Sequence, residues 1–339
     1  PVGVLNKGVQ SVISRGCVLD LEEVCEEIKS LKIEPYKLRI SGYCPIIEPT
    51  HKVIDKIKYQ KKLGTTAKGI GPAYSDFYAR DSLLLKDIVF DTEKSLIKIE
   101  HKFLEFYERM FCYDNLLLLK EEFNKFISWK DNFYKNVDFI KKYMSVTENL
   151  IQEFYKSKKN ILLEGAQGSG LSIHSNNYPD VTSSYPTIGG ALNSTGLNHT
   201  QIDEVIGVIK SYKTKVGTGL FPSQCYDGQE KILADVGKEF GATTGRPRKC
   251  GWLDLDEVKD AVLLNGVDHI CVIKTDVLSH VPKPKYYVHG RVYNLPKINE
   301  VNTFDIGFNE LLDVIKSQTG VKQISYTTGP KRGEIVWKI

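Results

Sequence analysis

The fold class of this chain can be read from residues 9–40, VQSVISRGCVLDLEEVCEEIKSLKIEPYKLRI. Its apolar start predicts a strand within residues 9–18, and apolar side chains then recur at helical spacing behind Asp20, a residue type that caps helix N-termini. Residues 37–40 predict a second strand. Because a strand, a helix and a strand in succession favour parallel pairing, we expect an α/β protein with a mainly parallel sheet.

The composition excludes several classes of protein. The chain has 339 residues, 41% of them hydrophobic and 26% charged, which is typical of a globular protein with a full-sized core. Its formal charge of +4, from 46 basic and 42 acidic residues, is too even for a protein that neutralises many nucleic-acid phosphates. No apolar run reaches the roughly 18 residues that span a membrane, and the N-terminus has no charged-then-apolar leader. Seven scattered cysteines without a CxxC pair indicate a reducing cytoplasm and no zinc site.

The pattern changes along the chain. Residues 55–62 predict a short helix that ends at Gly64, and residues 82–159 hold long helical patterns dense in Phe, Tyr, Leu and Lys. We interpret the latter as a helical insertion subdomain within a single domain, residues 1–339. Beyond it an α/β pattern returns, with strands predicted at 161–163, 205–209 and 270–273 and helices at 255–264 and 308–317.

A first candidate site is the loop GTTAKGIGPAY, residues 64–74. Glycines let backbone N–H groups converge on an anion, and Thr65 and Thr66 add hydroxyl donors that suit a phosphate. The loop is not the nucleoside-triphosphate motif GxxxxGK[ST], because Lys68 precedes a glycine. The alternative is a tight turn with a purely structural role.

A second candidate site is EGAQGSG, residues 164–170, directly after the strand predicted at 161–163. Ligands of open α/β sheets collect at the carboxyl ends of strands, so the carboxamide of Gln167 is placed to hydrogen-bond the edge of a base. The segment VTSS, residues 181–184, adds hydroxyl groups that include Thr182. The spacing differs from GxGxxG, which argues against a dinucleotide site.

A third candidate site is GATTGRPRKCGW, residues 241–252. Arg246 and Arg248 flank Pro247, whose ring stiffens the backbone, so the two guanidinium groups can point to different partners. Together with backbone N–H groups and threonine hydroxyls, they can bind a carboxylate. A solvated basic turn is the alternative.

A fourth candidate site is Lys-Thr-Asp at residues 274–276, directly after the strand predicted at 270–273. A carboxylate at Asp276 accepts both the N1 and N2 hydrogens of guanine and repels the N1 acceptor of adenine, while the stem of Lys274 can cover the ring. The segment TTGPKR, residues 327–332, can close over the same base. These residues therefore favour a guanine nucleotide.

Metal and nucleophile motifs do not occur in the sequence. The seven histidines are isolated, and neither H-E-x-x-H nor a paired-cysteine spacing is found. Ser169 lacks the GxSxG frame of a serine hydrolase. The remaining candidates are therefore the four loops above.

Seven segments together resemble one protein family. In chain order they are GTTAKGIGPAY, EGAQGSG, YPDVTSS, KVGTGLFPS, EFGATTGRPRKCGWLDL, KTDVL and TTGP, and they resemble the adenylosuccinate synthetases over nearly the whole chain. The resemblance implies a P-loop-NTPase-like ligase fold, with a large, mainly parallel central sheet flanked by helices. It also implies a homodimeric, Mg²⁺-dependent, cytoplasmic enzyme that uses GTP to join IMP and L-aspartate. The reaction would pass through 6-phosphoryl-IMP and release adenylosuccinate, GDP and phosphate.

The resemblance also implies roles for individual residues. IMP would contact Thr65, Thr66, Gln167, Thr182, Val216 and Arg246, and Arg80 would reach the IMP phosphate of the partner subunit. Aspartate would be bound through Ala242, Thr243, Thr244, Gly245, Arg246 and Arg248. GTP would contact Arg248, Lys274, Thr275, Asp276, Thr327, Thr328 and Gly329. Gln167 would also support catalysis.

The chain departs from the family pattern at several positions. Family members open with a strand and a GDEGKGK-like loop that supplies the catalytic Asp and a Mg²⁺ ligand, then a catalytic histidine, and here the resemblance begins after both. We therefore expect about 50–60 further residues before Pro1. The acid–base residues and the Mg²⁺ ligands would lie there, with no metal ligand in this chain. Phe77 stands where the family usually has Lys, and Lys68 and Pro247 stand where many members have Arg.

Two other functions stay open on the sequence. One is a related ligase that joins aspartate to a 2-amino purine nucleotide such as dGMP. The other is a GTP- or IMP-binding protein without ligase activity. All three readings expect small-molecule partners, with neither a nucleic acid nor a membrane among them.

Overall fold

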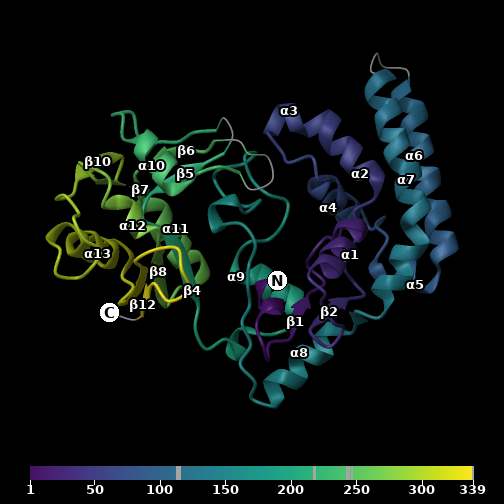
Figure 1. Cartoon of the computed structure of the whole chain (residues 1–339), viewed down its shortest axis with the longest axis horizontal. Coiled ribbons are helices and arrows are strands. Elements are labelled where there is room, and N and C mark those ends of the chain that lie inside the picture. Colours follow the sequence, from purple (N-terminus) through teal and green to yellow (C-terminus); the bar gives the residue numbers. More distant parts are fainter. Residues whose placement is uncertain (112–115, 217–218, 242–244, 246, 338–339) are drawn as a thin grey trace. The chain divides into compact units, whose positions relative to one another are not determined.

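The computed structural model describes the chain except for residues 112–115, 217–218, 242–244, 246 and 338–339. The chain divides into two compact units, which Figure 1 shows. Unit 1 comprises Pro1–His174 and Val181–Gln201, and unit 2 comprises Ser175–Asp180 and Ile202–Ile339. Each unit has a hydrophobic core of its own.

The sheet of unit 1 begins with the β-α-β sequence at the start of the chain. β1 (Ser11–Ile13) pairs in parallel with β2 (Leu38–Ser41), and β2 pairs in parallel with β3 (Met144–Ser145). Between β1 and β2 lies α1 (Leu21–Ser30), whose first turn is capped by the side chain of Asp20. The predicted helix, its cap and the parallel pairing are therefore confirmed.

Helices make up most of the rest of unit 1. α6 (Thr92–Phe111) and α7 (Leu116–Lys141) run side by side (Figure 1), and between them the rings of Phe103 and Phe126 stack with their centroids 4.0 Å apart. The helix predicted at 55–62 is part of a longer helical run that ends at Gly64, as expected. The other helices are α2 (Pro49–Ile54), the π-helical η2 (Asp55–Tyr59), α3 (Gln60–Leu63), α4 (Ile70–Ala79), α5 (Leu85–Phe90), α8 (Thr147–Lys156) and α9 (Ile188–Thr195), with 3₁₀ turns η1 (Val2–Leu5), η3 (Ser169–Leu171) and η4 (His199–Gln201).

Unit 2 holds a four-stranded sheet in the order β12-β11-β8-β4. β4 (Ile206–Lys210), β8 (His269–Ile273) and β11 (Gln323–Thr327) run parallel, and β12 (Ile335–Val336) is antiparallel to β11. The carboxyl ends of the three parallel strands meet at one edge, the position where α/β sheets bind ligands. The other elements are α10 (Glu230–Gly237), α11 (Leu255–Asn265), α12 (Thr275–Leu278) and α13 (Ile306–Thr319), the antiparallel pair β5 (Lys213–Lys215) and β6 (Lys249–Gly251), and a sheet of β7 (Leu253–Asp254), β9 (Lys285–Val288) and β10 (Arg291–Asn294).

The strands and helices predicted for unit 2 are confirmed. The strands expected at 205–209 and 270–273 are β4 and β8, and the helices expected at 255–264 and 308–317 are α11 and α13. Both helices have an aspartate cap at the start and a left-handed glycine at the end, signals that can be read locally. The α/β class with parallel pairing is therefore confirmed, and the described strands are distributed over four sheets.

One predicted strand is wrong. Residues 161–163 adopt no regular structure and pair with no described strand. Leu162 is 86% exposed, so the apolar run lacks the burial on both faces that stabilises a parallel strand. The apolar pattern alone does not show whether a pairing partner is at hand.

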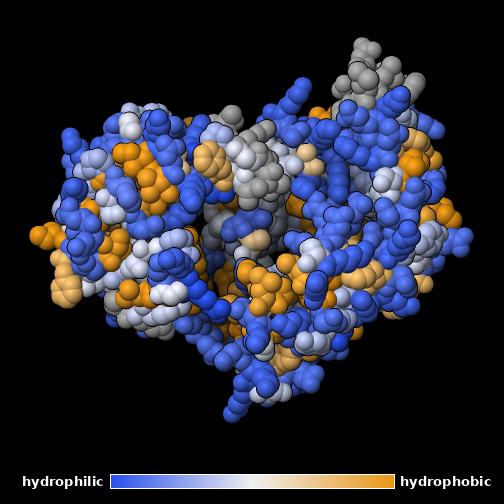
Figure 2. All heavy atoms as spheres, in the orientation of Figure 1, coloured by the Kyte–Doolittle hydropathy of each residue, from blue (hydrophilic) through white to orange (hydrophobic). Residues whose placement is uncertain are grey.

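The surface of each unit is mostly hydrophilic in the view of Figure 2, with apolar side chains scattered between the polar ones. Scattered apolar residues are normal on a globular protein. In the described part of the chain, no helix combines the length and the apolar character that crossing a membrane requires.

Candidate functional site

In unit 1 one buried carboxylate holds the glycine- and threonine-rich loop. Asp55, which is 3% exposed, accepts a hydrogen bond from the Thr65 hydroxyl at 2.7 Å and another from the Gly69 N–H at 2.9 Å. Both sides of the turn are thereby tied to η2, while Thr66 between them is exposed. The loop is therefore fixed before any ligand arrives, and Thr66 is open to a ligand.

Gly69 is a position where the backbone demands glycine. Its φ is +78°, in the left-handed region, and an added Cβ would lie 2.9 Å from the Lys52 nitrogen and 3.0 Å from the His51 carbonyl carbon. The loop therefore packs directly against α2. Lys68 beside it forms an ion pair with Glu23 of α1, so its ammonium group is already engaged.

The second and first candidate loops lie close together in unit 1. The Ser184 hydroxyl donates to the Gln167 side-chain carbonyl at 2.8 Å, and the Ser184 and Thr182 hydroxyls are 3.1 Å apart. Gln167 has a φ of +63°, which is uncommon for a non-glycine residue. A Cβ added at Gly71 would lie 3.4 Å from the Ser183 hydroxyl, which places the 64–74 loop beside this cluster. The structure thus brings Gln167, Thr182 and the 64–74 loop together.

Arg80 lies at the end of α4, next to the same loop in sequence. It ends the helix with a left-handed φ of +65° and is exposed. Its guanidinium group makes no hydrogen bond or ion pair with the residues that the structure describes. The side chain is therefore available to a ligand or to another protein chain.

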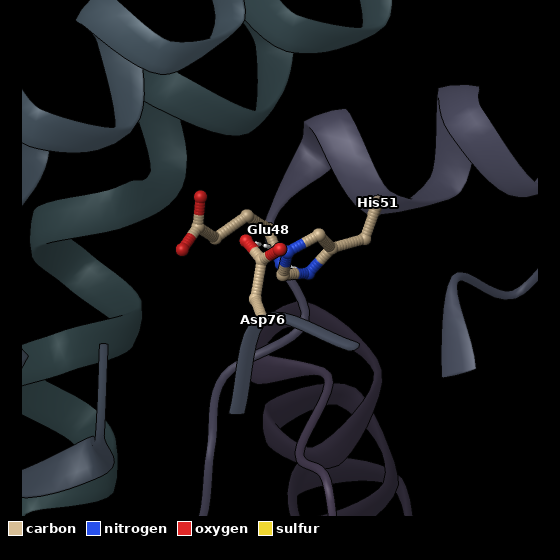
Figure 3. A group of neighbouring side chains, drawn as sticks. All are labelled: Glu48, His51 and Asp76. Atoms are coloured by element: carbon tan, nitrogen blue, oxygen red, sulfur yellow. Dashed lines mark hydrogen bonds and ion pairs between the residues drawn. The ribbon is translucent and has the colours of Figure 1, made fainter. Parts of the chain in front are cut away.

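A buried polar network supports this region from α2 and α4 (Figure 3). His51, which is 1% exposed, accepts from the Glu48 N–H at 3.0 Å through Nδ1, so its proton is on Nε2, 3.1 Å from the Asp76 carboxylate. Lys102 lies 2.6 Å from Asp76 and 3.4 Å from Glu48. The hydrogen bond from His51 lowers the pKa of Asp76, and burial opposes this less strongly. Asp76 is thus a firmly ionised anchor of α4.

Neither group of described side chains with metal-ligand spacing fits the Mg²⁺ that the resemblance implies. In Glu48, His51 and Asp76 both imidazole nitrogens are engaged and both carboxylates face an ammonium, whereas Mg²⁺ prefers free carboxylate oxygens and retained waters. In the second group, burial raises the pKa of Cys225 to about 12, so that thiol stays protonated. No metal-dependent step is therefore assigned to these residues.

In unit 2 the two segments of the fourth candidate site, residues 274–276 and 327–332, are joined directly. The Lys274 N–H donates to the Thr327 hydroxyl at 3.2 Å, and the Thr275 hydroxyl donates to the Thr327 carbonyl. Asp276 follows in the first turn of α12, half-buried, and its carboxylate makes no hydrogen bond or ion pair with any other described residue. The K-T-D and T-T-G segments, distant in sequence, therefore meet at the carboxyl ends of β8 and β11.

The turn after β11 is closed by Glu334. The Thr328 N–H donates to the Glu334 carbonyl at 2.9 Å, and a Cβ at Gly329 would overlap the Glu334 carboxylate. Gly329 therefore allows the turn to fold back tightly beside Thr327.

The base of the arginine-bearing loop is also ordered in unit 2. Arg248 donates from its backbone N–H to the Glu239 carbonyl at 2.9 Å and forms an ion pair with the Glu239 carboxylate at 3.0 Å. Gly245 has a left-handed φ of +62°, and Val216 is exposed. The predicted contacts Ala242, Thr243, Thr244 and Arg246 lie outside the described residues.

Two residues that organise these loops were not singled out from the sequence. Asp55 lies nine positions before Gly64 in a helical pattern, and Glu239 opens the quoted EFGATTGR segment. An acid beside a loop of cations is a weak signal for Glu239, and no local signal marks Asp55. Both act through contacts that exist only after folding.

The pKa of Glu239 makes stability in acid testable. Burial raises this pKa, but hydrogen bonds from Lys210 and Tyr212 outweigh burial and lower it from 4.5 to about 2. The ionised group therefore stabilises the fold fully above about pH 4.5 and loses this effect as the pH falls toward 2. We expect the thermal unfolding temperatures of Glu239→Gln and the unaltered chain to differ most at neutral pH and to converge near pH 2. A gap independent of pH would contradict the assignment.

Comparison with known proteins identifies the family. A sequence model of adenylosuccinate synthetase matches residues 1–323. The adenylosuccinate synthetase of Caldicellulosiruptor saccharolyticus is 36% identical over 379 aligned residues, which cover all of this chain and 86% of the relative. That of Psychrobacter cryohalolentis is 39% identical, covering 91% of this chain and 72% of the relative.

Solved structures agree with the sequence comparison. The fully ligated adenylosuccinate synthetase of Plasmodium falciparum superposes with a TM-score of 0.84 at 26% identity, over all of this chain and 87% of that one. The succinoaminodeoxyadenylate synthetase of cyanophage S-2L, bound to dGMP and dATP, has a TM-score of 0.63 at 18% identity over 99% of this chain and 79% of its own, a likeness of fold alone. The family model and the curated relatives show the family: the chain belongs to the adenylosuccinate synthetases.

Proposed function

We propose that this chain carries out the GTP-dependent ligation of IMP and L-aspartate, a step of purine biosynthesis that yields adenylosuccinate, GDP and phosphate. Family membership supplies the reaction. The observation that best supports its nucleotide is the contact between the K-T-D and T-T-G segments at the carboxyl ends of β8 and β11. A guanine base placed there would meet the carboxylate of Asp276, which no other described residue engages.

The IMP subsite would lie in unit 1. Thr65 and Thr66 would bind the phosphate, which is supported by the way Asp55 fixes the loop and leaves Thr66 exposed. Ser184 occupies the carbonyl oxygen of Gln167, so the Gln167 amide can donate. Directed at the 6-oxygen of IMP, that donor would stabilise the negative charge that develops there. Thr182 would complete the contacts of this unit with IMP.

The GTP and aspartate subsites would lie in unit 2. Lys274, Thr275, Asp276, Thr327, Thr328 and Gly329 would frame guanine, and Arg248 would approach the GTP ribose. Aspartate would bind through Ala242, Thr243, Thr244, Gly245, Arg246 and Arg248. The ion pair that fixes Arg248 against Glu239 supports an aspartate subsite at this position.

The chemistry proceeds in two displacements. The 6-oxygen of IMP attacks the γ-phosphorus of GTP, and GDP leaves. This step converts the 6-oxygen, a poor leaving group, into a phosphate ester that leaves readily. The aspartate amine then adds at C6 and the phosphate departs with the C–O bond electrons. Mg²⁺, on which the family depends, neutralises phosphate charge when bound, and the residues described here serve to bind and orient the three substrates.

Two wider properties are proposed with the reaction. Arg80 is exposed, and its guanidinium group has no partner among the described residues, which supports a homodimer in which it reaches the partner subunit's IMP. A cytoplasmic location is supported by the free thiols of Cys17, Cys25, Cys44, Cys225, Cys250 and Cys271.

The direct test mixes the native protein with IMP, L-aspartate, Mg²⁺ and GTP and follows adenylosuccinate by ultraviolet absorbance. We expect product with GTP and far less with ATP, because Asp276 repels the adenine N1 acceptor. Omitting aspartate is the control and should leave absorbance unchanged. Parallel reactions with dGMP in place of IMP test the related ligase, and turnover of dGMP without turnover of IMP would refute the proposal.

A further inference from the structure

One buried carboxylate in unit 2 collects side chains from three segments. Glu239 is fully buried, and its two oxygens contact Lys210 at 2.8 Å, Arg248 at 3.0 Å, Tyr212 at 2.6 Å and Lys274 at 3.2 Å. Lys210 ends β4, Lys274 follows β8, and Arg248 closes the base of the 240–248 loop. The carboxyl ends of β4 and β8 and the base of the loop thus meet at a single side chain.

The local backbone is shaped to make this meeting possible. α10 ends at Gly237, Lys238 turns the chain with a left-handed φ of +51°, and the Glu239 N–H donates back to the Ala234 carbonyl at 2.9 Å. A Cβ at Gly237 would overlap the Tyr212 hydroxyl, so only glycine lets Tyr212 reach Glu239. The Gly237 carbonyl also accepts from Lys274. The C-terminal end of α10 and the carboxylate of Glu239 therefore both attract the ammonium group of Lys274.

The charges in this cluster are unequal. One carboxylate faces three cations, Lys210, Arg248 and Lys274, and Tyr212 adds only a neutral donor. Cations that are partly removed from water repel one another unless an anion lies between them. Without the charge of Glu239 the three side chains would move apart toward solvent. Glu239 therefore determines where the ammonium of Lys274 and the guanidinium of Arg248 are held.

An ion pair with a purely structural role would need only one cation, and the backbone of that cation would need no special conformation. Here the Lys274 backbone is held separately, with a left-handed φ of +58°, a bond from its N–H to Thr327 and a bond from the Ser211 hydroxyl to its carbonyl at 2.9 Å. Its side chain has only Glu239 and the Gly237 carbonyl as partners among the described residues. Glu239 thus sets the direction of a side chain whose backbone is already fixed.

We propose that Glu239 is a positioning residue for the ligase reaction, which holds Lys274 beside the guanine subsite and Arg248 at the base of the substrate loop at the same time. The proposal rests on the nucleotide and aspartate subsites proposed above. It adds a single carboxylate that holds one cation of each subsite, so that damage to it affects guanine recognition and aspartate binding together.

The first experiment measures GDP and ADP binding by calorimetry to the unaltered chain, Glu239→Gln, the combination of Lys274→Met with Arg248→Gln, and all three changes together. The carboxamide keeps the size of the side chain and removes its charge. We expect Glu239→Gln to weaken GDP binding by at least about tenfold and to weaken ADP binding less. Because Glu239 acts through Lys274 and Arg248, the triple variant should bind GDP no more weakly than the combination without Glu239→Gln. A further loss in the triple variant would overturn the proposal.

The second experiment measures aspartate kinetics for Glu239→Gln, Arg248→Gln and their combination. We expect each single variant to raise the aspartate KM by about tenfold and the combination to add little more. A KM for aspartate that is unchanged in Glu239→Gln would overturn the role at the loop base.

Asp227→Asn is the matched control. Asp227 is another carboxylate of unit 2 with a pKa lowered to about 2, and it pairs with Lys285 away from the motif residues. Its variant should bind GDP and use aspartate normally. If Glu239→Gln fails to fold, Glu239→Asp, which keeps the charge and shortens the reach by one methylene, should show the same pattern more weakly, and normal GDP binding by it would refute the proposal.

The proposed guanine nucleotide and the proposed role of Glu239 can be refuted separately. An unaltered chain that binds GDP no better than ADP would refute the proposed nucleotide. An unaltered chain that prefers GDP, together with a Glu239→Gln variant that keeps this preference, would refute the positioning role alone.

Discussion

Asp276→Asn should lower kcat/KM for GTP by roughly a hundredfold. A carboxylate accepts from both N1–H and N2–H of guanine, and each charged hydrogen bond is worth about 1.5–3 kcal/mol. The carboxamide accepts only one and presents an N–H to the other. Asp276 is free for this role, since no other described side chain or backbone group engages its carboxylate.

Asp276→Asn should also change which nucleotide the enzyme prefers, in addition to weakening its use of GTP. Xanthine carries an oxygen where guanine has its 2-amino group, and the Asn amide can donate to that oxygen. We therefore expect Asp276→Asn to use XTP better than GTP, measured as kcat/KM for each nucleotide at saturating IMP and aspartate. Asp260→Asn, at an exposed position of α11, is the control and should keep the preference for GTP. If the ratio of kcat/KM for GTP to that for XTP were the same in Asp276→Asn and in the unaltered chain, guanine would not bind at Asp276.

Asp55→Asn should weaken IMP binding by about 10- to 100-fold, because the loop that would hold the phosphate loses its support. The carboxylate accepts from Thr65 and Gly69 at once, and the carboxamide must turn its own N–H₂ toward one of these donors. Gly69 is buried, so its N–H would lose its partner without gaining water, which costs about 1–3 kcal/mol. IMP binding by calorimetry and unfolding in urea would measure the two effects.

A matched substitution separates affinity from stability. Asp87 of α5 likewise accepts from a backbone N–H, that of Leu84 at 2.9 Å, and lies outside the proposed IMP contacts. Asp87→Asn should lower the free energy of unfolding by about 1 kcal/mol and leave IMP affinity intact. If Asp55→Asn behaved the same way, with a loss of stability and normal IMP binding, the loop would be a structural turn and the phosphate site would lie elsewhere.

The elements that were predicted well are those whose signals are local. α1 has Asp20 at its start and apolar residues on one face, and α13 begins after Asp305 and ends at Gly320, so propensity, capping and periodicity agree within a few residues. The strand predicted at 161–163 failed because apolar character reports a tendency to be buried. Whether a partner strand covers Leu162 depends on chain that is distant in sequence.

The chemical groups available for binding can be read from the amino-acid sequence: the threonines of the 64–74 loop, the carboxamide of Gln167, the lysine and aspartate after β8, and the arginines of the 240–248 loop. Their order along the chain is enough to indicate the family. How these groups are held is known only from the folded chain, because hydrogen bonds and ion pairs between residues distant in sequence depend on packing. Asp55 supports Thr65 and Gly69, and Glu239 joins Lys274 to Arg248, since folding buries each carboxylate where water cannot compete for the same donors.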